Sequence, residues 1–133
     1  MKKWLFALPV AATAGAIAAN LPGFMMGGPG EGWELAVTLG YLAAWALFLY
    51  RGGERWQLML SGIWWLASMV CCAVCFGVVT FGWDGFLMIF PAMAFGAPMS
   101  GLAVLTGRVY PVFYCLCTIL SAGYMLWAWR KTK

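Results

Sequence analysis

Long apolar segments alternate with short polar or glycine-rich segments along the whole chain. The clearest apolar segment runs from Trp56 to Trp83 and contains no charged side chain. As a helix it would be about 42 Å long, which exceeds the roughly 30 Å thickness of a bilayer's hydrocarbon core. The pattern therefore predicts a helical membrane protein and not a soluble domain.

Five apolar segments follow one another, at 4–21, 33–50, 56–81, 85–105 and 109–129. One substantial loop, at 22–32, separates the first two and is rich in glycine and proline, which favour turns and interrupt helices. The other connections are short, so neighbouring segments are expected to form antiparallel hairpins. We expect residues 1–133 to form a single all-α membrane domain, a compact bundle of four to five transmembrane helices.

The fourth segment differs from the others because Pro91, Gly96, Pro98 and Gly101 interrupt it. A proline inside a helix removes a backbone hydrogen bond and usually bends the helix. We expect this segment to be kinked or re-entrant at Pro91/Pro98. Broken helices in transporters expose backbone groups that bind substrate near the middle of the membrane, so these four residues are candidates for a transport pathway. The alternative is a bent helix that only packs.

The positively charged residues leave two topologies open. If all five segments cross, five cations share the side of the N-terminus and three lie on the other side. If the fourth segment is re-entrant, the division becomes seven and one. The positive-inside rule favours the second arrangement, whereas the rarity of re-entrant segments favours the first. Both predict a multi-pass protein of the cell membrane with a cytoplasmic N-terminus, unless the small residues Ala16-Ile17-Ala18 mark a cleaved signal peptide.

Composition adds two constraints, one on the partners of the chain and one on its chemistry. Only 9% of the residues are charged and 65% are hydrophobic, and the charges stand at segment ends. The net charge of +4 therefore marks membrane flanks, so the expected partner is the lipid bilayer and no nucleic acid. The sequence contains no histidine, which excludes His-ligated haem, the usual zinc sites and histidine general-base catalysis. Glu34 and Asp84 are expected at the outer rim. They could attract cations there, or they are explained by capping of a helix N-terminus and by a solvated turn.

Cysteines form the sharpest local cluster. Cys71, Cys72 and Cys75 share one face of a helix at i, i+3 and i+4 spacing. Thiolates suit a soft metal ion such as Cu(I), and a Cys-x-x-Cys pair also exchanges disulfides. The alternative is that these thiols pack as small hydrophobic groups. Cys115 and Cys117 point to different helix faces, and Cys115 reaches the depth of the cluster only in the four-crossing topology.

Without an intramembrane acid, base or paired catalytic group, we expect a protein without catalytic activity and without a cofactor. The leading hypothesis is a small transporter or channel protomer, or an accessory membrane subunit. The competing hypothesis is a membrane thiol protein that handles a soft metal ion or exchanges disulfides through Cys71, Cys72 and Cys75. A third is a purely structural membrane protein. Small-residue faces on the first and fourth segments predict packing against copies of the chain or against a partner membrane subunit.

Overall fold

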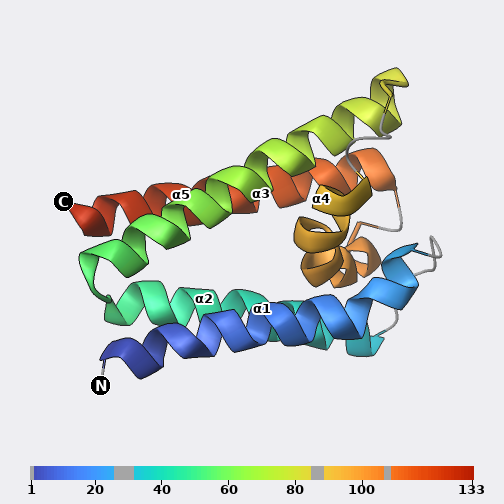
Figure 1. Ribbon diagram of the computed structural model, residues 1–133. Helices are drawn as coiled ribbons and strands as arrows, with labels where there is room; N and C mark the ends of the chain where they lie inside the picture. Colours follow the sequence, from blue (N-terminus) through green and yellow to red (C-terminus); the bar gives the residue numbers. More distant parts are fainter. Residues whose placement is uncertain (1, 26–31, 85–88, 107–108) are drawn as a thin grey trace.

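The computed structural model describes residues 2–25, 32–84, 89–106 and 109–133, and these residues are almost entirely helical (Figure 1). Four helices are long and apolar enough to cross a membrane. They are α1 (Lys2–Met25), α2 (Gly32–Arg51), α3 (Arg55–Phe81) and α5 (Tyr110–Thr132). The chain is thus an all-α protein with four candidate membrane spans, in the class that the apolar pattern predicts.

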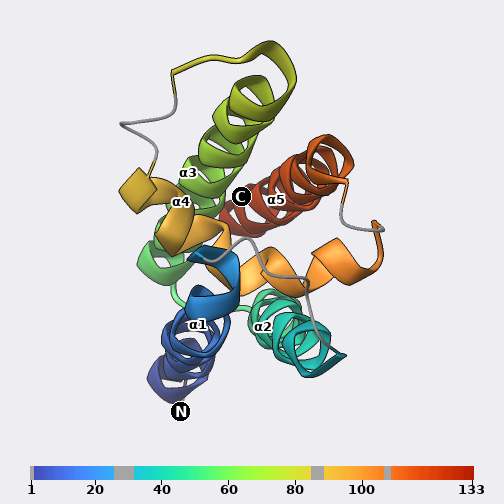
Figure 2. The ribbon, with the colours of Figure 1, turned by 90° about the vertical axis from the view of Figure 1, so that its right-hand side faces the viewer.

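The four long helices form two antiparallel pairs, α1 with α2 and α3 with α5 (Figure 1). The α3–α5 pair has the most extensive packing in the molecule. Both chain ends lie at the same end of the bundle as the turn between α2 and α3. Seen along the helices, α1 and α3 lie on one side, with α2 and α5 on the other (Figure 2).

The turn between α2 and α3 is built by local backbone geometry. Gly52 has a φ of 76°, a left-handed conformation that suits glycine, and its N–H donates to the Phe48 carbonyl at 2.9 Å. The N–H of Glu54 donates to the Gln57 side-chain oxygen at 3.0 Å, which satisfies a donor at the start of α3. The tight turn predicted here is therefore present, but α2 and α3 diverge from it, and each packs mainly with another helix (Figure 1).

The fourth apolar segment consists of two short helices, α4 (Ile89–Phe95) and the 3-10 helix η2 (Ala97–Val104). At about 1.5 Å and 2.0 Å of rise per residue, each is much shorter than the hydrocarbon core. Pro91 and Pro98 each lie in the first turn of a short helix, where the missing N–H removes no helical hydrogen bond. The break falls between the two helices, at Gly96.

Helix α1 extends further than the sequence suggested. It continues to Met25, so the expected loop at 22–32 begins in the structure as helix, and 26–31 lie outside the described residues. Pro22 costs the helix one hydrogen bond, yet the helix continues through it. Phe24 and Met25, which the sequence assigned to the loop, therefore belong to α1.

An aromatic cluster joins the two helix pairs. Trp65 of α3 stacks on Tyr124 of α5, with ring centroids 4.4 Å apart, and meets Trp45 of α2 edge-on at 5.7 Å. The Tyr124 hydroxyl donates to the Leu42 carbonyl of α2 at 2.8 Å. These contacts tie α2 to both helices of the other pair, and Trp65 at their centre is fully buried.

Candidate functional site

One threonine hydroxyl holds η2 between the long helices. The Thr38 hydroxyl of α2 donates to the Pro98 carbonyl at 2.9 Å and accepts the Gly101 N–H at 3.0 Å. It also accepts the Asn20 side-chain N–H of α1 at 3.2 Å. Thr38 and Asn20 are both completely buried. Three elements, α1, α2 and η2, therefore meet at a single hydroxyl group, which we call the Thr38 junction.

Gly101 brings the backbone of η2 against the first turn of α2. A Cβ atom at this position would overlap the Glu34 carbonyl and the Leu35 Cα. Because the obstructing atoms belong to the backbone, they cannot move aside as a flexible side chain would. Gly101 is therefore required by close packing at the junction.

The four predicted pathway residues do not form one group. Pro98 and Gly101 meet at the Thr38 junction. Gly96 is buried where α4 gives way to η2. Pro91 is half-buried on α4 and lines a separate apolar depression with Phe95. Sequence reasoning identified the segment but missed Thr38, because a single threonine in an apolar helix gives no signal until its neighbours are known.

The acidic residues Glu34 and Asp84 lie toward the end of the bundle opposite the two termini. Glu34 lies in the first turn of α2, as expected, and one helical turn before Thr38, but it is only 4% exposed. The cause is the close approach of η2 to the first turn of α2. Asp84, by contrast, is exposed after α3, as expected.

Two buried oxygen atoms in this region have no hydrogen-bond partner within the described part of the protein. They are Oδ1 of Asn20 and Oγ of Ser100. Buried polar atoms normally have partners, because desolvating an unpaired one costs free energy. Each of these oxygens is therefore a buried acceptor without a partner among the described residues.

The cysteine cluster gains a member from a second helix. Cys71, Cys72 and Cys75 are buried on α3, and the Cys71 and Cys75 thiols interact with each other. Cys72 interacts with Cys117 of α5, which is completely buried. Cys115 is exposed on another face of α5. The i, i+2 spacing predicts different faces for the two α5 thiols, but the sequence pointed to Cys115 as the possible partner of the cluster, whereas the structure places Cys117 there.

The arrangement of the thiols resembles helix packing more than a ligand cage. All five cysteines are free, and among the described residues no group of three or more His, Cys, Asp or Glu side chains is placed to hold a metal ion. Ser68 and Ser121 share a hydrogen bond of 2.9 Å in the same α3–α5 interface. Small side chains thus line the surface along which these two helices pack closely.

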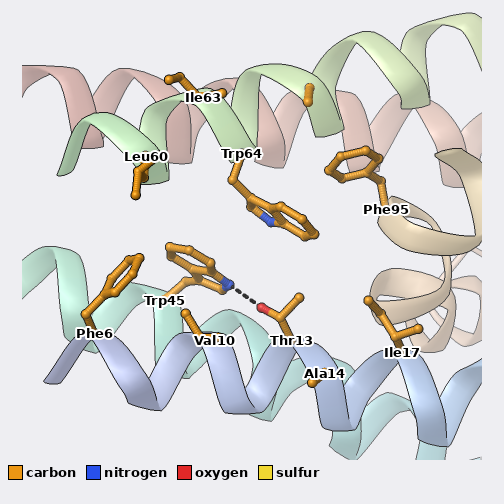
Figure 3. Close-up of a pocket in the computed structure, with 11 residues that line it drawn as sticks. Phe6, Val10, Thr13, Ala14, Ile17, Trp45, Leu60, Ile63, Trp64 and Phe95 are labelled. Carbon is orange, nitrogen blue, oxygen red and sulfur yellow. Dashed lines mark hydrogen bonds between the residues drawn. The ribbon is translucent and has the colours of Figure 1, made fainter. Parts of the chain in front are cut away.

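An apolar groove lies between α1 and α3 (Figure 3). Its volume is about 650 Å³. The ring of Phe6 meets that of Trp56 edge-on at 5.6 Å near one end, and Trp64 meets Phe95 of α4 at 4.6 Å near the other. The residues that line it are Phe6, Val10, Thr13, Ala14, Ile17, Trp45, Leu60, Ile63, Trp64, Ala67 and Phe95.

The polar atoms of the groove lining already have partners. The Trp45 indole N–H donates to the Thr13 hydroxyl at 3.0 Å, and that hydroxyl donates to the Pro9 carbonyl at 2.7 Å. The Trp64 indole N–H donates to the Tyr41 hydroxyl at 3.1 Å. The groove therefore presents a hydrocarbon surface to any occupant.

Comparison with known proteins gives no match to a family model, a curated protein or a solved structure. The function is therefore inferred from the contacts, burial and charges of this chain alone.

Proposed function

We propose that the protein is a non-catalytic membrane component of the transport type, a transporter or channel protomer or an accessory subunit of one. In this proposal α1, α2, α3 and α5 cross the membrane. The segment formed by α4 and η2 enters and leaves on the side opposite both termini. The four candidate spans and the common end of the two termini support this arrangement.

The distribution of positive charge supports the same topology. Seven of the eight cations belong to the end of the bundle that carries both termini, namely Lys2, Lys3, Arg51, Arg55, Arg130, Lys131 and Lys133. Arg108, in the connection between η2 and α5, lies outside the described residues. Because cytoplasmic flanks carry an excess of Lys and Arg, we assign the end with the termini to the cytoplasm.

The observation that carries the transport proposal is the buried backbone of η2. Irregular backbone within a membrane is tolerated where protein surrounds it or where it lines a cavity, and broken segments of this kind hold substrate in transporters. The Thr38 junction supplies hydrogen bonds to the buried Pro98 carbonyl and the buried Gly101 N–H, so these backbone groups are not left without partners. The free oxygens of Asn20 and Ser100 lie on the elements that meet there.

The cargo that fits these groups is a small uncharged molecule with hydrogen-bonding groups. No charged side chain lies midway along any of the four described spans, so a charged cargo would lack a counter-ion. Asn20 and Ser100 supply oxygen atoms that accept hydrogen bonds, and the serine hydroxyl also donates one.

A proteoliposome swelling assay with glycerol and urea as probes tests this function. We expect permeability above that of protein-free liposomes. Ser100→Ala should reduce this permeability, because it removes a hydroxyl group that binds the cargo. The same change removes no hydrogen bond within the described protein, so it should leave the fold intact. Ser61→Ala is the matched control, since the Ser61 hydroxyl bonds its own helix at the Gln57 carbonyl. Permeability equal to the protein-free background would contradict transport by this chain, and a stoichiometric partner isolated with it would then favour a structural role.

The second candidate function is a membrane thiol protein that handles a soft metal ion or exchanges disulfides. It is favoured by the presence of Cys117 beside Cys72, which brings thiols from two helices together. Serine replacement of Cys71, Cys72 and Cys75 tests it, with Cys115→Ser as the exposed control. If Cu(I) retention and the fraction of the remaining cysteines that stay reduced change no more than in the control, this candidate is eliminated.

Association with copies of the chain or with a partner membrane subunit remains a prediction. Ala16 of α1 is buried within the protein, whereas Gly15 has open space around its Cα. Ala11 and Gly15 are both exposed, so the small-residue face that they form on α1 is the one available to another helix.

A further inference from the structure

We propose that the groove between α1 and α3 binds one acyl chain of an anionic phospholipid from the leaflet on the side of the two termini. Its walls are two candidate membrane spans, and Val10, Leu60 and Ile63 line it while about half of each side chain's surface remains exposed. The groove therefore opens sideways, in the direction of the lipid.

The length of the groove matches one leaflet. Along α1 it extends from Phe6 to Ile17, which corresponds to about 16 Å of helix (Figure 3). That distance is roughly half of the 30 Å hydrocarbon core. The occupant is thus expected to lie along the helices, with its head at the Phe6 end and the end of its chain near Phe95.

The width of the groove suits a single chain and not a helix. A volume of about 650 Å³ over about 16 Å gives a mean cross-section of roughly 40 Å², about half that of a helix 10 Å across. The polar atoms of the lining already have partners, so a polar ligand would gain no hydrogen bond inside. Both features favour a hydrocarbon chain.

Charge complementarity selects the lipid class. The Phe6 end of the groove lies toward the end of the bundle that carries seven cations, and Trp56, which contacts Phe6, directly follows the exposed Arg55. Of the described acids, Glu34 and Asp84 lie toward the opposite end, whereas Glu54 lies at the end with the cations and accepts the Trp56 indole N–H, so that end keeps seven cations against one described acid. A headgroup next to Trp56 thus meets an excess of positive charge, which attracts anionic lipid by about 1 kcal/mol for each nearby Lys or Arg.

Native mass spectrometry of the full-length protein, exchanged into detergent with added phosphatidylglycerol or phosphatidylcholine, tests this site. We expect the wild-type chain to retain one phosphatidylglycerol molecule preferentially. Ala14→Phe fills the groove and should abolish retention. Ala43→Phe makes the same change at an exposed position of α2 outside the groove and should preserve it. Arg55→Gln should lower the preference for phosphatidylglycerol by about fivefold, the equivalent of one cation.

Ala67→Phe fills the groove from the α3 side and should reproduce the loss if Ala14→Phe fails to yield folded protein. Equal retention by the groove-filling and Ala43→Phe proteins would overturn the site. Equal retention of phosphatidylcholine and phosphatidylglycerol by the wild-type chain would overturn the anionic specificity. A change of oligomeric state in Ala14→Phe with unchanged lipid retention would also overturn the proposal, because the groove would then receive a helix of a second copy.

Discussion

At the scale of single residues, the Thr38 hydroxyl of α2 forms hydrogen bonds to two other elements, α1 and η2. Replacing Thr38 by valine keeps the side-chain shape and removes this group. The buried Gly101 N–H and Pro98 carbonyl would then lose a partner, at about 1–3 kcal/mol for each group left unpaired. We expect a clearly lower unfolding midpoint in detergent, measured by circular dichroism.

Thr118→Val is the matched control for this change. The Thr118 hydroxyl bonds only within its own helix in the described structure, at the Tyr114 carbonyl 2.8 Å away. Its loss leaves the ladder of α5 intact, so the midpoint should stay close to that of the wild-type protein. Equal effects of the two variants would show that the Thr38 junction does not stabilise the fold.

The sequence identifies candidate residues better than their contacts. It marks Cys71, Cys72 and Cys75 as one helix face, and all three are buried on α3. It does not reveal that Cys117 joins them, because that depends on the rotation of α5 about its own axis. The burial of Glu34 was not predicted for a similar reason, since only the tertiary approach of Gly101 covers the start of α2.

At the scale of elements, the contact between η2 and α2 depends on a glycine. Gly101→Ala would place a Cβ against the Glu34 carbonyl, so η2 must move away from α2. Gly15→Ala makes the same chemical change inside α1, where the added Cβ meets open space. There it should stabilise the helix by about 0.5–1 kcal/mol.

Thermal unfolding of both purified variants measures this difference. We expect opposite signs, with a lower midpoint for Gly101→Ala and an unchanged or higher one for Gly15→Ala. A neutral Gly101→Ala would mean that η2 is not packed against the backbone of α2.

Element boundaries follow from the sequence where backbone chemistry alone decides them. Gly52 and the residues after it fix the turn between α2 and α3 in the place predicted. The end of α1 was predicted too early, because Pro22 and Gly23 favour turns in water but remain helical here. The two short helices of the fourth segment also depend on η2 packing against α1 and α2, which local sequence does not contain.

At the scale of the whole molecule, composition determines the class and leaves the arrangement open. A chain with 65% hydrophobic residues must form helices that satisfy their own backbone in lipid. The same composition makes the helices apolar on most faces, so periodicity does not show which face meets which neighbour. The pairing of α3 with α5 and the position of η2 therefore came only from the structure.

The central claim is that four helices cross the membrane and that both termini lie in the cytoplasm. Two fusions to the C-terminus test it, one to green fluorescent protein, which is active in the cytoplasm, and one to alkaline phosphatase, which is active outside. The four-crossing arrangement predicts a fluorescent first fusion and an inactive second one. A dark first fusion with an active phosphatase would place the C-terminus outside, require a fifth crossing through α4 and η2, and contradict the account.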